Sequence, residues 1–216
     1  MTTRKNQTPT LPILDAIDSL NAQVRKFHPE APETTIVLGS SGKLKNGLKL
    51  GHFAPSTWAA TDTKHEILIS GEALGRGAEA VLATLLHENA HAIAHTHDIR
   101  DTSNNGRYHN KRFKVIGEAL GLVLTNTPTI GWSGSTLAPE TALRYQAGID
   151  KLARVLTTYR VSTSTLDPDN TPKPKERNKT KTLVDCECES PVTVSKIWFE
   201  SASMHCNACD TDFQAI

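Results

Sequence analysis

Hydrophobic residues recur every three or four positions in four stretches of the chain, and this spacing predicts four amphipathic helices. The predicted helices span residues 12–27, 77–95, 110–120 and 139–159. A proline-containing segment, residues 28–32, is expected to end the first helix, and Gly121 is expected to end the third.

Three short stretches rich in β-branched and aromatic residues lie between the first two predicted helices. They cover residues 34–38, 48–53 and 66–70. We expect them to form a small antiparallel sheet, which makes the predicted fold class α+β. Residues 98–106 are polar and predict a loop, and the glycines and serines of 131–135 predict a turn.

The composition changes sharply near residue 161. Residues 162–182 contain three prolines and almost no apolar residues, which is typical of a flexible linker. The 216 residues suit one ordinary domain with a small appendage. We therefore predict a first domain over 12–160, a basic linker over 161–182 and a cysteine-bearing module over 183–216.

The overall charge does not favour any class of partner. Lysine and arginine number 24 and aspartate and glutamate 23, so the net charge is +1. No apolar run approaches the ~20 residues that cross a bilayer, and the N-terminus lacks an apolar signal core. We expect a cytoplasmic monomer with no membrane partner, and association with the nucleoid is compatible with this.

The segment His87-Glu88-Asn89-Ala90-His91 is an HExxH motif inside the second predicted helix. Four residues make slightly more than one helical turn, so both imidazoles point to the same side and can reach one zinc ion. Glu88 is expected to act as general base toward a zinc-activated water. The alternative is a helix whose histidines are merely solvated.

Four downstream residues are candidates for the third zinc ligand: His95, His97, His109 and Glu118. His95 lies ~12 Å along the helix from the first histidine of the motif, which is too far. His97 has the metzincin spacing, but Ala94 replaces the required glycine and no methionine turn follows. His109 opens a helix that can fold back on the motif and is favoured, while His97 and Glu118 remain open.

All four cysteines form two pairs near the C-terminus, Cys186-x-Cys188 and Cys206-x-x-Cys209. In a reducing compartment this pattern indicates a tetrahedral structural zinc, and reduced thiols without metal are the alternative. A strand-like stretch, 192–199, separates the pairs. A module of this length has little core, so metal would supply much of its folding free energy.

Basic residues gather in two places that could contact nucleic acid. Residues 98–114 carry five basic against two acidic residues, and 173–181 carry five against one. The candidate contacts are Arg107, Lys111, Arg112, Lys173, Lys175, Arg177, Lys179 and Lys181. An ordinary solvated helix start explains the first group equally well. The cysteine module has six acidic residues and only Lys196, which argues against phosphate binding by it.

The HExxH motif, a polar loop and His109-Asn110-Lys111-Arg112-Phe113 together resemble the SprT-like (Spartan-type) metallopeptidases. The resemblance covers roughly residues 12–125, and the cysteine module is similar to the zinc ribbon that ends many family members. It implies a zincin-like core, His109 as third ligand and Phe113 as an anchor of the returning helix.

The resemblance also implies a function, which is cleavage of proteins attached to DNA, as in repair of DNA–protein crosslinks. We therefore expect a zinc endopeptidase with one catalytic and one structural Zn²⁺, a protein substrate and DNA as a further partner. The alternative is a non-proteolytic protein that binds zinc and nucleic acid and uses the histidine site only for structure.

Overall fold

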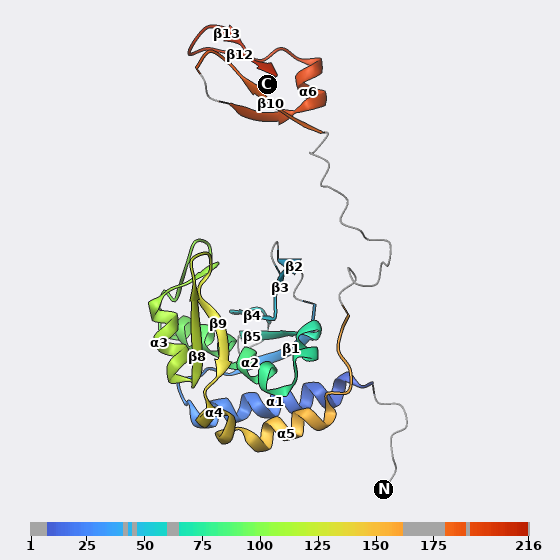
Figure 1. The fold of residues 1–216 in the computed structure, drawn as a ribbon, viewed down its shortest axis with the longest axis vertical. Helices are drawn as coiled ribbons and strands as arrows, with labels where there is room; N and C mark the ends of the chain where they lie inside the picture. Colours follow the sequence, from blue (N-terminus) through green and yellow to red (C-terminus); the bar gives the residue numbers. More distant parts are fainter. Residues whose placement is uncertain are drawn as a thin grey trace. The chain divides into compact units, whose positions relative to one another are not determined.

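The computed structural model describes residues 8–40, 43–44, 47–59, 65–161, 180–188 and 191–215. The chain forms two compact units, Met1–Ser162 and Thr163–Ile216, and the ribbon of Figure 1 shows helices and small sheets in both. The predicted α+β class is confirmed. In the described part of the chain, no helix has the length and apolar character needed to cross a membrane.

The first unit contains two sheets of three and four strands, one two-stranded hairpin and six helical segments among its described residues. The helical segments are α1 (Thr10–Phe27), η1 (Gly71–Arg76), α2 (Ala78–Thr96), α3 (Lys111–Ala119), α4 (Pro139–Arg144) and α5 (Gln146–Val155). One sheet has the order β1-β5-β4, from strands β1 (Thr34–Gly39), β4 (Gly51–Ala54) and β5 (His65–Ser70). The other has the order β6-β7-β9-β8, from strands β6 (Thr102–Ser103), β7 (Tyr108–His109), β8 (Leu122–Thr127) and β9 (Gly131–Leu137). A short hairpin, β2 (Lys43–Leu44) with β3 (Gly47–Leu48), precedes β4.

Helix α2 is the centre of the first unit. It packs against β4 and β5 on one side and against β9 and α3 on the other, and Figure 1 shows it between the two sheets. Its apolar residues are buried almost all round, including Val81, Leu82, Leu85 and Leu86, as expected of a helix enclosed by its neighbours. Helices α1 and α5 pack side by side below it. The HExxH motif therefore lies on the most enclosed element of the fold.

The first sheet is mixed, so the expectation of a purely antiparallel sheet was wrong. Strand β1 pairs with β5 in parallel, and β4 pairs with β5 antiparallel. The chain reverses once between β1 and β4 and again between β4 and β5, which returns β5 to the direction of β1. Strand β4 thus remains at the edge of the sheet, against α2.

The predicted helix over 139–159 is interrupted and shorter than expected. It breaks at Tyr145, whose fully buried ring packs edge-on against Phe27 at 5.2 Å between centroids. It then ends at Val155, and the following segment packs on η1, where the Arg160 backbone N–H donates to the Gly71 carbonyl at 2.9 Å. Burial of one aromatic ring outweighs the local helical pattern here.

The predicted turn over 131–135 is part of strand β9. Its glycines allow close approach between strands: a Cβ at Gly134 would collide with the Thr125 hydroxyl, and one at Gly131 with the His109 carbonyl oxygen. Glycine in a strand often marks such an approach, which a single sequence does not distinguish from a turn.

The second unit is small and contains little core. Its elements are β10 (Lys181–Asp185), β11 (Val192–Ser195), α6 (Lys196–Ser201), β12 (His205–Cys206), β13 (Thr211–Asp212) and β14 (Gln214–Ala215). Strands order as β11-β10-β14, and β12 pairs with β13. The strand expected over 192–199 becomes helix α6 after four residues. Within 180–188 and 191–215, Val184 is the only buried hydrophobic residue.

Candidate metal centres

Three histidines from two distant segments meet beside α2. His87 and His91 lie one turn apart on the helix, and His109 comes from β7. The Nε2 atom of His109 lies 3.2 Å from Nε2 of His87 and 3.1 Å from Nε2 of His91. The three side chains form a group that could hold a metal ion.

The pairing of β7 with β9 positions His109 beside the other two histidines. It pairs with Gly131 of β9, and its backbone N–H donates to the Ile130 carbonyl at 3.0 Å. Gly131 has φ +67°, a conformation that favours glycine, and any Cβ there would strike the His109 backbone. Substitution of Gly131 is therefore expected to displace the third histidine.

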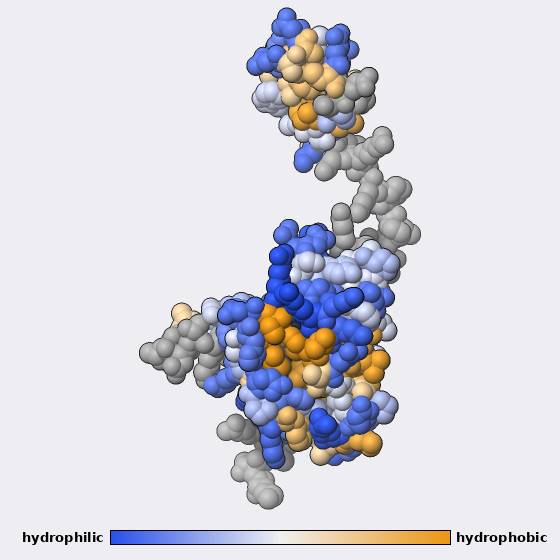
Figure 2. All heavy atoms as spheres, turned by 90° about the vertical axis from the view of Figure 1, so that its left-hand side faces the viewer, coloured by the Kyte–Doolittle hydropathy of each residue, from blue (hydrophilic) through white to orange (hydrophobic). Residues whose placement is uncertain are grey.

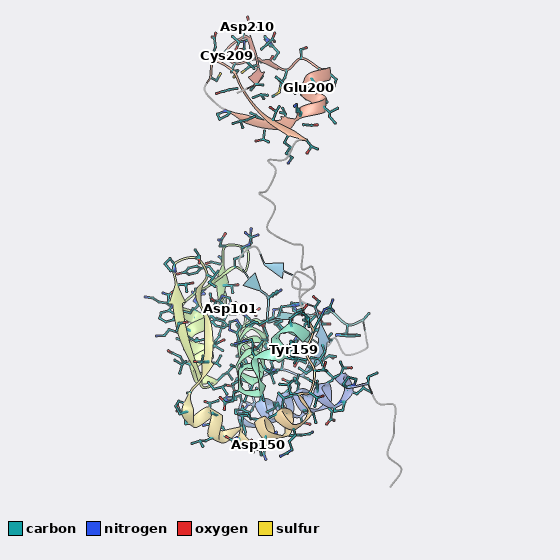
Figure 3. All side chains as sticks on the ribbon, turned by 45° about the vertical axis from the view of Figure 1, so that its right-hand side comes forward. Asp101, Asp150, Tyr159, Glu200, Cys209 and Asp210 are labelled. Carbon is teal, nitrogen blue, oxygen red and sulfur yellow. The ribbon has the colours of Figure 1, made fainter. Side chains whose placement is uncertain are left out.

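The hydrogen bonds made by the Nδ1 atoms of the three rings indicate that the Nε2 atoms are the ones free to bind a cation. Nδ1 of His91 lies 2.5 Å from the carboxylate of Asp101, which is labelled in Figure 3, and Nδ1 of His109 lies 3.3 Å from the Ile130 carbonyl oxygen. Both partners accept, so each Nδ1 donates the hydrogen bond, which in a neutral ring leaves Nε2 with its lone pair. His87 Nδ1 lies 3.3 Å from the Ser135 hydroxyl. This outer shell is typical of metal-binding histidines.

Two of the three histidines, His87 and His109, have a lowered pKa, which favours the neutral imidazole that binds metal. Burial lowers the pKa of His87 well below its ordinary value, and the charges of His91 and His109 lower it further. Burial, followed by the His91 charge, lowers the pKa of His109 to about 4.

The spacing of the nitrogens fits a small tetrahedral ion. Zinc at ~2.0–2.1 Å from each nitrogen would separate two ligand nitrogens by about 3.3–3.4 Å. The two observed separations, 3.2 and 3.1 Å, lie close to this value, and three converging lone pairs would repel one another without a cation between them. The residues present therefore fit a zinc ion.

The ring of Phe113 packs against all three imidazoles. Its centroid lies 4.6 Å from those of His87 and His109 and 4.7 Å from that of His91, and the side chain is fully buried. Asn110 holds this residue in place by capping α3, since its Oδ1 accepts from the backbone N–H of Phe113 at 3.3 Å. Phe113 thus anchors the returning helix, as the sequence resemblance implied.

Glu88 follows His87 on α2, and its buried carboxylate lies beside the edge strand β4. Its carboxylate accepts a hydrogen bond from the backbone N–H of Phe53. Burial raises the pKa of Glu88, partly opposed by the charges of His91 and Lys49. A Cβ on Gly51 would lie 3.1 Å from Glu88 Oε1 and 2.8 Å from a backbone oxygen, so glycine lets β4 approach this close. A carboxyl of raised pKa suits proton transfer near neutral pH.

The motif's Asn89 is structural. It lies on the opposite side of α2, fully buried, and its Nδ2 donates to Asn21 Oδ1 at 3.2 Å. Asn21 in turn donates to the Thr34 hydroxyl at 2.9 Å. These bonds tie α2 to α1 and β1 and fix the face that the histidines present.

The other candidates for third ligand lie elsewhere. His95 packs against Phe53 and His65, with ring centroids 5.7 Å and 5.3 Å away. His97 is the C-cap of α2, and Glu118 pairs with Lys114 at 3.5 Å. None of the three belongs to the ligand group found among the described residues.

The four cysteines of the second unit form the other candidate metal centre. Cys186, Cys188, Cys206 and Cys209 make one group, and the Sγ atoms of Cys188 and Cys206 are 3.8 Å apart. Tetrahedral zinc–sulfur bonds of ~2.3 Å separate two sulfurs by about 3.8 Å. Hydrogen bonding to Thr211 lowers the pKa of Cys209, labelled in Figure 3, to about 6, which favours the thiolate.

The expected nucleic-acid contacts are only partly described. Arg107 is exposed in the turn before β7, and Lys111 and Arg112 are exposed at the start of α3. Lys181 is exposed and belongs to β10, so it is not in the linker. The remaining candidates, Lys173, Lys175, Arg177 and Lys179, lie outside the described residues.

Asp101 and Ser135 belong to the site, although the sequence alone does not identify them. In the sequence Asp101 is one of several charges in a polar stretch, and Ser135 lies in a segment whose glycines and serines predict a turn. Asn110 supplies the missing connection, because its backbone N–H donates to the Asp101 carbonyl at 3.0 Å and its Nδ2 to the Arg100 carbonyl at 2.8 Å. A polar residue directly after the third histidine was the available signal.

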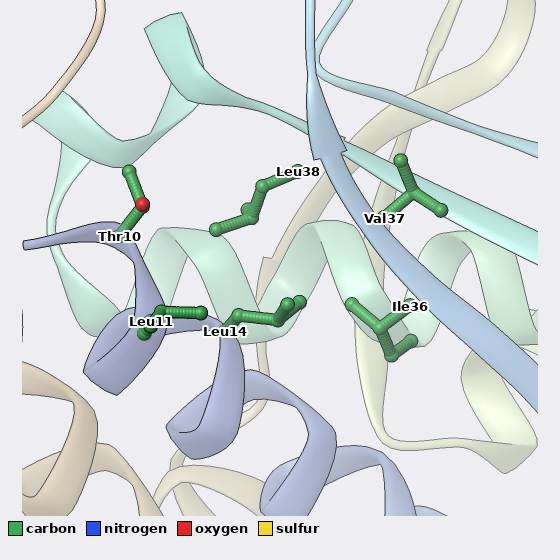
Figure 4. Close-up of a pocket in the computed structure, with 6 residues that line it drawn as sticks. All are labelled: Thr10, Leu11, Leu14, Ile36, Val37 and Leu38. Carbon is green, nitrogen blue, oxygen red and sulfur yellow. The ribbon is translucent and has the colours of Figure 1, made fainter. Parts of the chain in front are cut away.

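An apolar groove elsewhere on the first unit carries no comparable chemistry. Figure 4 shows its lining, which comes from α1 and β1: Thr10, Leu11, Leu14, Ile36, Val37 and Leu38. It contains no ionisable side chain and none of the metal-centre residues.

Comparison with known proteins gives no support beyond this geometry. No protein-family model, curated protein or solved structure matches the chain. Its function must therefore be inferred from the two side-chain clusters.

Proposed function

We propose that the first unit is a zinc-dependent endopeptidase with a zincin-like, SprT-like core that cleaves DNA-associated proteins. The proposal rests on one observation: Nε2 of His109 lies within 3.2 Å of Nε2 of both His87 and His91. The next residue after His87 is Glu88, a buried carboxyl whose pKa is raised. Three neutral imidazoles leave an open coordination position on zinc, which is typical of catalytic sites.

Zinc bound to these histidines would supply Lewis acidity, both to polarise a peptide carbonyl and to acidify a water molecule. The chain's own residues do the rest. Glu88 accepts the proton of the attacking water and passes it to the leaving amine. Asp101 and the Ile130 carbonyl hold the His91 and His109 rings with their Nε2 atoms inward.

The edge strand β4 offers a place for the substrate backbone. Among the described strands, β4 pairs only with β5. The Phe53 N–H that binds Glu88 faces away from β5, so the carboxylate lies along the strand's outer edge. A substrate segment added at this edge would run beside the general base, a common mode of peptide recognition.

The decisive test compares the wild-type protein with Glu88→Gln on an unfolded protein substrate such as casein. We expect hydrolysis to fall by ~10²–10⁴-fold, because the amide cannot accept a proton. Metal analysis should show unchanged zinc content, since Glu88 is not a ligand. Glu118→Gln, on exposed α3, is the matched control and should remain active.

An unimpaired Glu88→Gln enzyme contradicts the mechanism. If the wild type is inactive on every substrate while zinc stays bound and nucleic acid binds, the non-proteolytic alternative is correct. The part of the proposal that concerns DNA rests on the family resemblance and on exposed Arg107, Lys111 and Arg112. Replacing these three by serine should reduce the salt dependence of oligonucleotide binding by ~0.7 per lost contact on single strands.

A further inference from the structure

The second unit exposes several large apolar side chains: Leu183, Val192, Ile197 and Trp198. Figure 2 shows hydrophobic atoms reaching the surface of this unit. Ile197 of α6 is 72% exposed and Trp198 is 49% exposed, while Val184 is the only buried hydrophobic residue in 180–188 and 191–215. A cysteine-bound metal can stabilise such a module without a core, so these side chains are not required inside.

Helix α6 places a carboxylate next to this apolar surface. Glu200 lies three residues after Ile197, so the two side chains share a face of the helix. Glu200 is 61% exposed, and its contact with Lys196 is long, at 3.7 Å. We call the exposed side of α6, where Ile197 is flanked by Trp198 on one side and Glu200 on the other, the α6 face.

The described part of the second unit is acidic as a whole. The described residues of the unit carry five carboxylates, Asp185, Glu187, Glu200, Asp210 and Asp212, against Lys181 and Lys196. Figure 3 labels Glu200 and Asp210 on this unit. A surface of this sign repels phosphates and attracts cationic groups over a distance of ~8 Å at physiological salt.

We propose that the α6 face binds a basic polypeptide segment that carries apolar side chains. Exposed tryptophan and isoleucine would supply the contact area, since tryptophan is enriched among residues that dominate binding energy. The carboxylates would select lysine- and arginine-rich partners and speed their encounter. Basic segments with interspersed apolar residues are common in proteins that bind DNA. The second unit would therefore bind such proteins as substrates for the first unit, an inference that rests on the proposed endopeptidase function.

Nucleic acid is the competing occupant, because Trp198 could stack on bases. The excess of carboxylates among the described residues disfavours nucleic acid at α6, because stacking by one aromatic ring would have to overcome their repulsion of the phosphate backbone. The proposal therefore places protein recognition in the second unit.

The test measures binding without hydrolysis, on the full Glu88→Gln chain loaded with zinc. The probe is a fluorescein-labelled peptide that contains lysines and leucines, followed by fluorescence anisotropy over a salt series. Ile197→Ser combined with Glu200→Gln should weaken binding by ~10-fold or more and flatten its salt dependence. Trp198→Ser should weaken it similarly, and unchanged zinc content checks that the module stays folded.

Helix α4 provides a matched control in the other unit. Leu143 is 74% exposed and lies three residues after exposed Glu140, the reverse arrangement of the α6 pair. Leu143→Ser with Glu140→Gln should leave peptide binding unchanged. A probe with serines in place of leucines, or glutamates in place of lysines, should bind weakly.

Three results would overturn the proposal: no binding of the lysine–leucine peptide, equal loss in the α4 control, or a Trp198-dependent affinity for single-stranded oligonucleotide that exceeds that for the peptide. The binding assay does not measure hydrolysis, so its result can be interpreted even if the endopeptidase proposal fails. If peptide binding is confirmed while casein cleavage is absent, the module is a docking unit of a non-proteolytic protein.

Discussion

The two candidate metal centres are organised in opposite ways. The histidines lie on a framework with a continuous hydrophobic core, and fully buried Phe113 supports their rings. The cysteines lie in a unit whose described residues bury only Val184. The first candidate site is held together by a hydrophobic core, whereas the second unit has so little core that we expect a bound metal to supply much of its stability.

The hydrogen-bond partners of the ligands also differ between the two candidate centres. Each outer nitrogen of the three histidines has a partner from another element, namely Asp101, Ser135 or the Ile130 carbonyl. The contacts of the cysteines stay within the module, as in the pair formed by Cys209 and Thr211 at 3.1 Å. Metal removal and substitution should therefore affect the two units unequally.

The largest expected effect is that of a strong chelator. Zinc contributes ~10–16 kcal/mol to folding in zinc-finger peptides, so the cysteine module should unfold when stripped. The first unit should keep its structure, because its core does not depend on the ion. Amide NMR spectra of the full chain, recorded before and after chelation, would show collapse of the resonances of 180–215 alone. Loss of both sets would contradict the comparison.

Phe113→Ala tests the framework of the histidine site directly. Removing a fully buried phenylalanine should cost ~3–5 kcal/mol in the free energy of unfolding of the first unit. Val115→Ala, on the exposed side of the same helix, should cost within ~0.5 kcal/mol. Urea denaturation followed by circular dichroism measures both. Equal costs would mean that α3 is not packed as described.

Asp101→Asn should weaken zinc binding while leaving the fold intact. Loss of a carboxylate partner of a metal-binding histidine typically lowers metal affinity by 10–100-fold, or ~1.4–2.7 kcal/mol. Competition with a chromogenic chelator gives the affinity, and Asp98→Asn nearby is the matched control. An unchanged affinity would show that the Asp101–His91 contact does not orient the ring.

Asn110→Ala should have the smallest effect, ~1 kcal/mol, through loss of the α3 cap. Asn110→Asp keeps the capping oxygen but loses the bond from Nδ2 to the Arg100 carbonyl. If the aspartate variant matches wild type in stability but binds zinc less tightly, the bond to the 98–101 loop helps place Asp101. Thermal unfolding and the same chelator competition distinguish these outcomes.

Much of the local structure could be predicted because it depends on short-range periodicity. The helix over 77–95, the helix over 110–120 and the pairing of His87 with His91 follow from the repeat of 3.6 residues. The turn predicted at 131–135 failed because glycine also permits strands to approach closely, as Gly131 does beside His109. The continuous helix predicted over 139–159 failed because core burial of Tyr145 broke it.

The sequence by itself determined which side chains are available as ligands and how those within one helix turn or one cysteine pair are spaced, because these relations depend only on neighbours in the chain. Only the tertiary structure decided that His109 joins the pair, that Asp101 and the Ile130 carbonyl orient the rings, and that β4 brings Phe53 to Glu88. Those contacts join segments far apart in the chain, and packing of the whole first unit selects them from many local alternatives.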